Sequence, residues 1–148
     1  RALMRAHLGQ RKSDAEQQQQ HKPIYDALVL GLTCDRDELY RRINLRVDKM
    51  IADGLEEEIR KLIEPHDESV WDLQSMQGIG YKEWKQYFLG NQTVDETAEL
   101  IKKNSRQFAK RQYTWFNNQM HVEWFDIGYE DWHEKLFARV KKWLANKG

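Results

Sequence analysis

The sequence is poor in several residue types that would define whole classes of protein. Its 148 residues include one cysteine, Cys34, and two prolines. A single cysteine excludes an internal disulfide and a cysteine-rich zinc site. No apolar run approaches the roughly 20 residues that a helix needs to cross a bilayer, and no signal peptide is visible. We therefore expect no membrane partner, and the low cysteine content fits a cytoplasmic location.

Neither the spacing of the histidines nor the net charge indicates a ligand. The 5 histidines are scattered without the spacing of metal ligands, so no metal site is expected among these residues. The 24 Lys and Arg residues balance the 24 Asp and Glu residues. Any affinity for nucleic acid must therefore come from a local patch. With 40% hydrophobic and 32% charged residues, the composition is that of a globular domain with a sizeable core.

One local patch lies between Leu100 and Val122, a stretch without Asp or Glu. It interleaves basic residues with aromatic ones: Lys102, Lys103, Arg106, Lys110 and Arg111 with Phe108, Tyr113, Trp115 and Phe116. Clustered bases without acids are typical of phosphate binding, although the same pattern occurs on solvated helix faces. On a helix, one side could pack into a core, namely Ile101, Ser105, Phe108, Gln112 and Trp115. The opposite side would hold charge towards a partner, namely Lys103, Arg106, Lys110, Tyr113 and Asn117.

The remaining pattern predicts a mainly helical chain with two short strands, at residues 25–33 and 121–126. A long helix is expected from about Arg36 to Glu64 unless it breaks at Gly54, with Asp35 as its N-cap and Glu38 as capping-box partner. Residues 66–73 indicate a polar loop, and residues 81–89 a helix. Thr93 and Glu96 predict a second capping box, ahead of the helix that carries the basic stretch. Residues 131–145 predict an amphipathic terminal helix.

The turn from Gln77 to Lys82 contains Gly78 and Gly80. Glycines let a backbone approach another chain closely, and backbone N–H groups at a helix start can hold an anion. The alternative interpretation is an ordinary turn that opens a helix, with Tyr81 in the core.

Several of these segments together resemble one family. SMQGIGYKEW at residues 75–84 and KNSRQFAKRQYTWF at residues 103–116 resemble the C-terminal half of the tRNA dimethylallyltransferases, also called tRNA isopentenyltransferases. RAL at Arg1, GLT at Gly31, RRINLRVDKMIADGLEEEI from Arg41 and WFD at Trp124 extend the resemblance over nearly the whole chain. The sequence opens without Met and lacks the family's phosphate loop, GxxxxGK[ST], so we expect the C-terminal part of a longer protein.

The resemblance implies an α/β fold class, mostly helical in this part: the C-terminal part of a P-loop nucleotide-kinase-like fold with two short strands. Residues 1–22 would be the end of a helical insertion region plus a mobile glutamine-rich loop. Residues 23–148 would be the C-terminal part of the prenyltransferase core with its tRNA-binding helices.

The implied reaction transfers a dimethylallyl group from dimethylallyl diphosphate to N6 of the adenosine next to the tRNA anticodon. It requires cations on the departing diphosphate, a base for the amine proton and an adenine turned out of its stack. In the family, the phosphate loop, a catalytic aspartate and the Mg²⁺ environment belong to the N-terminal half. Mg²⁺ ligands are therefore expected outside this chain, which alone should be inactive. A monomer is expected.

Carried over residue by residue, the resemblance places Arg46 at the donor diphosphate. Arg42, four residues earlier on the same side of the helix, either joins it or pairs with an acid. A larger set would contact the anticodon stem-loop of tRNA: Arg1, Gln77, Gly78, Ile79, Gly80, Tyr81, Lys82, Lys103, Arg106, Lys110, Arg111 and Gln112. Many family members carry an arginine where this chain has Asn117, so the basic patch is weaker by one charge.

Two other hypotheses stay open. The chain could be a stand-alone helical RNA-binding module that uses the basic helix, or a helical structural domain without a ligand. Prenyl transfer by the full-length protein separates the first hypothesis from both, and RNA retention by the chain separates the two alternatives from each other.

Overall fold

The computed structural model describes residues 25–146. The expectations for residues 1–22, including the RNA contact of Arg1, lie outside the described residues and stay predictions. The described elements follow the chain in this order: β1 (Leu30–Thr33), α3 (Arg36–Ala52), α4 (Leu55–Ile63), 3₁₀ helices at Glu68–Asp72, Gln74–Gln77 and Lys82–Trp84, α5 (Lys85–Phe88), α6 (Val94–Gln119), β2 (Glu123–Asp126) and α7 (Trp132–Ala145).

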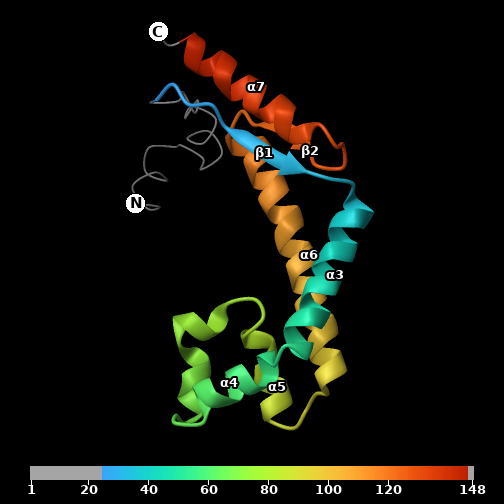
Figure 1. Ribbon diagram of the computed structural model, residues 1–148. Coiled ribbons are helices and arrows are strands. Elements are labelled where there is room, and N and C mark those ends of the chain that lie inside the picture. Colours follow the sequence, from blue (N-terminus) through green and yellow to red (C-terminus); the bar gives the residue numbers. More distant parts are fainter. Residues whose placement is uncertain (1–24, 147–148) are drawn as a thin grey trace, which may run out of the picture.

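Helices α3 and α6 lie side by side and join two ends of the molecule (Figure 1). At one end, which we call the helical end, α4, α5 and the 3₁₀ helices gather around the adjoining parts of α3 and α6. At the other end, which we call the strand end, β1, β2 and α7 lie beside the C-terminal part of α6. β1 and β2 pair in parallel, with Leu30 opposite Glu123 and Thr33 opposite Asp126. The expected fold class, mostly helical with two short parallel strands, is confirmed.

The hydrophobic core lies at the helical end. Trp84 is fully buried, and its ring meets the edge of Tyr87 with 5.3 Å between centroids. The other members come from α3, α4, α6 and the 3₁₀ segments between them: Val47, Leu55, Ile59, Val70, Trp71, Met76 and Ile101. Residues 66–73, expected as a polar loop, therefore contribute to this core. A 3₁₀ helix turns Val70 and Trp71 inward until each is only 5% exposed.

The predicted helix starts and stops are largely confirmed. Asp35 caps α3 by accepting backbone hydrogen bonds from Asp37 and Glu38. The helix expected from about Arg36 to Glu64 breaks at Gly54, the one break that the sequence allowed, and Gly54, at φ +102°, separates α3 from α4. Such a positive φ favours glycine because any Cβ would crowd the backbone.

The two expected capping boxes have different outcomes. Thr93 and Glu96 form the reciprocal pair, since the Glu96 carboxylate also accepts from the Thr93 backbone N–H at 2.8 Å. At the start of α3, the capping-box role of Glu38 was wrong. Its carboxylate accepts hydrogen bonds from Arg41 and Arg42 instead, because both guanidinium groups lie within one helical turn.

Two elements differ from expectation in length or type. The first strand covers only Leu30–Thr33 of the nine positions from 25 to 33. The helix expected at residues 81–89 is a 3₁₀ turn, Lys82–Trp84, followed by the short α5, Lys85–Phe88. A strand needs a neighbour for its backbone hydrogen bonds, and β1 has only the four-residue partner β2 among the described residues.

The strand end is held by aromatic and polar contacts. Trp124 of β2 stacks on Tyr113 of α6, with 4.6 Å between ring centroids. Its indole N–H donates to the side-chain oxygen of Asn117 at 2.9 Å. Arg139 of α7 donates to the Glu123 carboxylate of β2 at 2.6 Å. These contacts occupy Tyr113 and Asn117, which had been expected on a face turned towards a partner.

Candidate functional site

The largest concentration of predicted site residues lines a cleft between α3, the turn after Gln77 and α6. The cleft encloses about 740 Å³. Arg46 reaches it from α3, Lys82 from the turn and Arg111 from α6. No Asp or Glu is among its lining residues, which also include Leu39, Ile43, Val47, Met50, Gln77, Gly78, Ile79, Gly80, Ile101, Ser105, Phe108, Ala109 and Gln112. We call it the basic cleft; three cations on an apolar floor make it suited to an anion with a hydrophobic or aromatic part.

Arg46 reaches the cleft because of its place on α3. The next residue, Val47, is buried in the core, while Ile43 and Met50 line the floor. Arg46 lies at the edge of this apolar stripe, so its charged group remains exposed. A guanidinium offers a planar fork of donors to phosphate oxygens and stays charged in such a setting.

The backbone N–H groups of the turn that forms one wall of the cleft already make hydrogen bonds within the protein. Gly80, at φ +97°, donates its N–H to the Glu83 carboxylate at 2.8 Å. The N–H groups of Tyr81 and Lys82 both bond to the carbonyl of Gly78. The Gln77 side chain donates to the Trp71 carbonyl at 2.6 Å. The N–H groups of residues 80–82 are therefore not available to an anion, and the side chains must supply any anion contact there.

The basic residues of α6 divide into two groups. Lys103, Lys110 and Arg111 are exposed, and Lys110 and Arg111 border a shallow groove that also contains Trp115. Arg106 is half-buried and donates to the Asn44 side chain of α3 at 2.6 Å. Arg106 therefore uses part of its donor set to join two helices, and its contact with RNA stays a prediction.

Lys102 makes a second link between α6 and α3. Its ammonium lies 2.7 Å from Asp48 and 2.9 Å from Glu99, and its side chain is 13% exposed. The hydrogen bonds that Lys102 donates to the Asp48 and Glu99 carboxylates raise the pKa of Lys102 above its ordinary value. Together with the bond between Arg106 and Asn44, this ion pair joins α3, which carries Arg46, to α6, which carries Arg111.

Arg42 has the acidic partner that one of its two interpretations required. Its Nε lies 2.6 Å from the Glu38 carboxylate, and Arg41 bonds to the same group. Hydrogen bonds from Arg41 and Arg42 lower the pKa of Glu38 to about 2. Arg42 does not line the basic cleft, and only Arg46 of the pair is placed there.

Tyr81 lies in the environment that a structural role would require. Its ring packs against the core, and its hydroxyl donates to the Glu58 carboxylate of α4. That hydrogen bond raises the pKa of Tyr81 above its ordinary value. Tyr81 is not among the residues that line the basic cleft, so stacking on an RNA base stays a prediction.

Sequence reasoning missed the residues that hold the site together. Asn44 and Asp48 of α3 received no role, and neither did Asn104 or Glu83. One signal was available for Glu83, because it stands between aromatic residues in the run YKEWKQYF. A charged residue inside such a run needs a partner if the run is buried.

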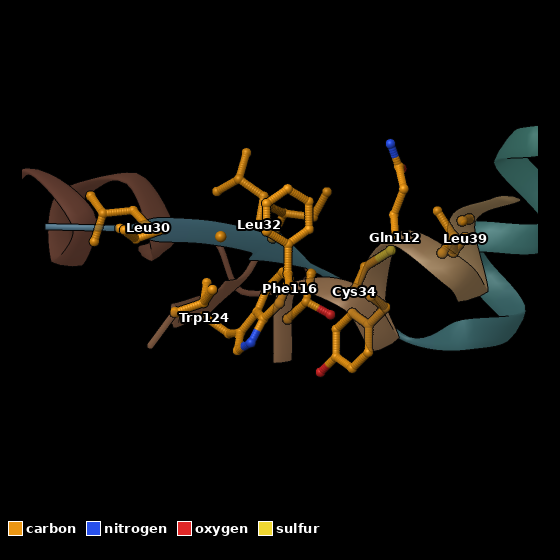
Figure 2. Close-up of a pocket in the computed structure, with 14 residues that line it drawn as sticks. Leu30, Leu32, Cys34, Leu39, Gln112, Phe116 and Trp124 are labelled. Carbon is orange, nitrogen blue, oxygen red and sulfur yellow. The ribbon is translucent and has the colours of Figure 1, made fainter. Parts of the chain in front are cut away.

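A second cavity lies at the strand end, between β1, β2 and α6. It encloses about 370 Å³ and has no charged residue in its lining. Figure 2 draws Leu32 of β1 next to Phe116 of α6, and Leu30 and Trp124 of the two strands also line the cavity. Leu39 and Gln112 line both this cavity and the basic cleft, so the two are neighbours.

Neither a metal site nor a membrane helix is present in the described part of the chain. Among residues 25–146, no group of three or more His, Cys, Asp and Glu side chains is arranged to hold a metal ion. Within the same residues, no helix combines the length and the apolar content that crossing a bilayer requires.

Both the sequence and the fold of the chain can be compared with those of known proteins. The profile of a protein family described as "IPP transferase" matches residues 1–119. A tRNA dimethylallyltransferase of Geobacillus thermodenitrificans is 51% identical over 135 residues, which cover 91% of this chain and 42% of that protein. The tRNA dimethylallyltransferase of Bacillus subtilis is 48% identical over 119 residues, 80% of this chain and 37% of that protein.

Solved structures agree with these sequence relatives. A tRNA Δ(2)-isopentenylpyrophosphate transferase of Staphylococcus epidermidis superposes with a TM-score of 0.73 at 35% identity, covering 93% of this chain and 45% of that one. The full-length tRNA isopentenylpyrophosphate transferase of Bacillus halodurans gives a TM-score of 0.72 at 40% identity, covering 91% and 43%. The chain thus spans less than half the length of each of these relatives. Its profile match, its relatives and its fold agree, and the chain belongs to the IPP transferase family.

Proposed function

We propose that this chain is the C-terminal part of a tRNA dimethylallyltransferase. The enzyme would transfer the dimethylallyl group of dimethylallyl diphosphate to N6 of the adenosine beside the tRNA anticodon, in the cytoplasm and as a monomer. The observation that carries the proposal is the basic cleft. It brings Arg46 together with Lys82 and Arg111, from the segments that most resemble the family, and no acid lines it. Relatives with this name support the same assignment.

In the proposed reaction, the allylic C–O bond of the donor breaks and a bond forms between that carbon and N6 of adenine. The electron pair of the broken bond stays on the diphosphate, whose negative charge increases. The Arg46 guanidinium would bind the diphosphate oxygens. It should bind them more strongly in the transition state than in the ground state, because their negative charge is then larger. The N6 proton leaves to a base that we place outside this chain, and this chain alone would be inactive.

Mg²⁺ would neutralise part of the diphosphate charge in the intact enzyme. Among residues 25–146, no group of three or more His, Cys, Asp and Glu side chains is arranged to hold a metal ion, and no acid lines the basic cleft where the diphosphate is proposed to bind. We therefore propose that the ion is held by the part of the protein that this chain lacks.

The RNA would lie along the turn and the exposed part of α6. Gln77, Gly78, Ile79, Gly80 and Lys82 form one wall of the basic cleft, and Arg111 and Gln112 belong to the helix that borders it. Lys103 and Lys110 are further exposed cations of the same helix. The anticodon stem-loop is the proposed occupant, because phosphates require cations and an extruded base requires a cleft.

The direct test substitutes Arg46 in the intact enzyme. Arg46→Ala should lower kcat by about 100-fold, as loss of one electrostatic donor does in other active sites. Arg46→Lys should recover part of the rate, since a point charge replaces a fork. The measurement is single-turnover prenyl transfer at saturating donor and tRNA, with Arg41→Ala as the control because Arg41 is exposed and bonded to Glu38. A folded Arg46→Ala enzyme with the unsubstituted rate would remove Arg46 from the site.

A second test concerns the RNA. Replacing Lys110 and Arg111 with Gln should weaken tRNA binding and reduce the slope of log affinity against log salt by roughly one for each phosphate that is no longer neutralised. Lys141 and Lys142 of α7, also exposed, supply a control with the same change in net charge. Unchanged affinity and slope would make this part of α6 structural. RNA binding by an intact protein without prenyl transfer would favour the RNA-binding module instead.

A further inference from the structure

Glu83 is the most deeply buried acid among the described residues, with 7% of its surface exposed. One carboxylate oxygen accepts from the backbone N–H of Gly80 at 2.8 Å, and the other accepts from the Asn104 side chain at 2.6 Å. No Lys or Arg of residues 25–146 forms an ion pair with it. Two neutral donors therefore take the place of the cation that a buried carboxylate usually has.

These two bonds connect the parts of the basic cleft. Gly80 ends the wall formed by residues 77–80, at a positive φ that glycine adopts readily. Asn104 belongs to α6 and directly precedes Ser105, which lines the opposite side of the cleft. The Glu83 carboxylate thus joins the wall to the helix across 21 residues of sequence. The other hydrogen bonds of the turn run within it, to the Trp71 carbonyl, to the Glu58 carboxylate of α4 or to the Trp84 N–H, and none of these reaches α6.

We propose that Glu83 is a positioning residue for RNA: it fixes the Gly78–Gly80 wall at the separation from α6 that admits the nucleotide. This inference rests on the proposed function. Glu83 itself touches no substrate, since its side chain is buried and does not line the cleft. Removing the carboxylate would leave the Gly80 N–H and the Asn104 amide without partners, and each would seek a new one by moving the wall.

The experiment compares four variants of the intact enzyme. Glu83→Ala removes both acceptors. Glu83→Gln keeps one acceptor, the amide oxygen, which can still accept from Gly80. Its amide N–H can donate to the side-chain oxygen of Asn104 once that side chain has rotated, so both links can persist. Asn104→Ala removes only the link to α6. Glu68→Ala is the control, an exposed glutamate in a neighbouring 3₁₀ helix.

Steady-state prenyl transfer separates the KM for tRNA, the KM for dimethylallyl diphosphate and kcat. We expect Glu83→Ala to raise the KM for tRNA about tenfold, the factor that corresponds to the removal of one buried hydrogen bond. The KM for the donor and kcat should change less than about twofold. Asn104→Ala should raise the KM for tRNA by a smaller factor, while Glu83→Gln and Glu68→Ala should stay close to the unsubstituted enzyme. Hydrogen exchange of the Gly80 amide should be faster in Glu83→Ala than in Glu68→Ala.

Several outcomes would overturn the inference. A purely structural Glu83 would lower the melting temperature and the active fraction, and thus kcat, with an unchanged KM for tRNA. Equal rises in both KM values would show that the wall serves the donor instead. If Glu83→Ala does not fold, Asn104→Ala with an unchanged KM for tRNA is enough to reject the link. Absence of prenyl transfer from the unsubstituted enzyme would contradict the proposed function, whereas the Gly80 exchange rates would still test the hydrogen bond.

Discussion

The helical end and the strand end are stabilised in different ways. Every buried hydrophobic residue of the described chain lies between Val47 and Ile101, which places the core at the helical end. At the strand end, neither β1 nor β2 nor α7 contains a buried residue, and Phe137 and Leu144 of α7 are 62% and 56% exposed. Contacts such as that between Arg139 and Glu123 hold α7 to β2.

This difference separates two sources of stability. Burial of apolar surface contributes roughly 25 cal/mol for each Å², so the helical end has a large favourable term of its own. Exposed pairs contribute about 0–1 kcal/mol each, and two strands make a marginal sheet. The basic cleft is lined on one side by the turn of residues 77–82, beside the core, and on another by α6, which extends to the strand end. The loss of folding free energy caused by a substitution should therefore be larger at the helical end than at the strand end.

The largest expected effect is at the core. Trp84→Ala should lower the free energy of unfolding by about 3–5 kcal/mol, because a fully buried indole is replaced by a cavity. Trp115→Ala, at a position 51% exposed, is the matched control and should cost less than about 1 kcal/mol. Urea unfolding followed by circular dichroism at 222 nm measures both. Similar losses of unfolding free energy for the two variants would contradict the difference in stability between the ends.

A smaller effect is expected at Gly31, where β1 approaches β2. A Cβ on Gly31 would overlap the Trp124 ring and a methyl group of Val122, so Gly31→Ala must displace these side chains and should cost about 1–3 kcal/mol. Gly54 is the comparison, because a Cβ there meets nothing within 4 Å but φ is +102°. Gly54→Ala should cost roughly 1–2 kcal/mol through backbone strain alone.

Unfolding measurements on the two glycine variants would distinguish steric from conformational cost. Adding Trp124→Leu should recover part of the stability lost in Gly31→Ala and none of that lost in Gly54→Ala. Recovery in both, or in neither, would show that the Trp124 ring is not what limits residue 31.

The smallest effect concerns pH at the strand end. The Arg139 guanidinium holds the pKa of Glu123 below its ordinary value of 4.5. A carboxyl whose pKa is lowered by folding stabilises the folded state above the unfolded pKa, and this contribution is lost as the pH falls through the folded pKa. Below about pH 4.5, the melting temperature of the unsubstituted chain should therefore fall more steeply than that of Glu123→Gln.

A comparable substitution at the helical end is Glu56→Gln. The pKa of Glu56 is also lowered, first by the Tyr87 hydroxyl and then by Arg60. Melting temperatures of both variants between neutral and acidic pH would show whether the strand end is the more acid-sensitive of the two. Identical slopes for Glu123→Gln and the unsubstituted chain would mean that the Arg139 pair contributes nothing.

Features decided by neighbours in sequence were predictable. Asp35, Gly54 and the pair of Thr93 with Glu96 act within one helical turn, so their residue types indicate where helices begin and end. The positions of both strands also followed from short apolar runs. The family resemblance indicated which segments would bind RNA or the donor, whereas their meeting at one cleft came from the structure.

Features decided by distant partners were not predictable. Periodicity placed Ile101, Phe108 and Trp115 on one side of α6, yet Ile101 is 2% exposed and the other two are 46% and 51% exposed. A pattern specifies a face of a helix but not what covers it. The bond from Arg106 to Asn44 joins residues 62 positions apart, and no local signal identifies such a partner.

The burial of Trp71 and Trp84 makes the two ends separately visible by fluorescence. Trp71 and Trp84 are 5% and 0% exposed, whereas Trp115, Trp124, Trp132 and Trp143 belong to the other end and all remain accessible to solvent. Iodide in solution should quench the emission of these four residues and leave a shorter-wavelength component from the core. Each half of the molecule thus carries its own intrinsic optical probe, and RNA that covers the groove beside Trp115 should protect part of the quenchable emission.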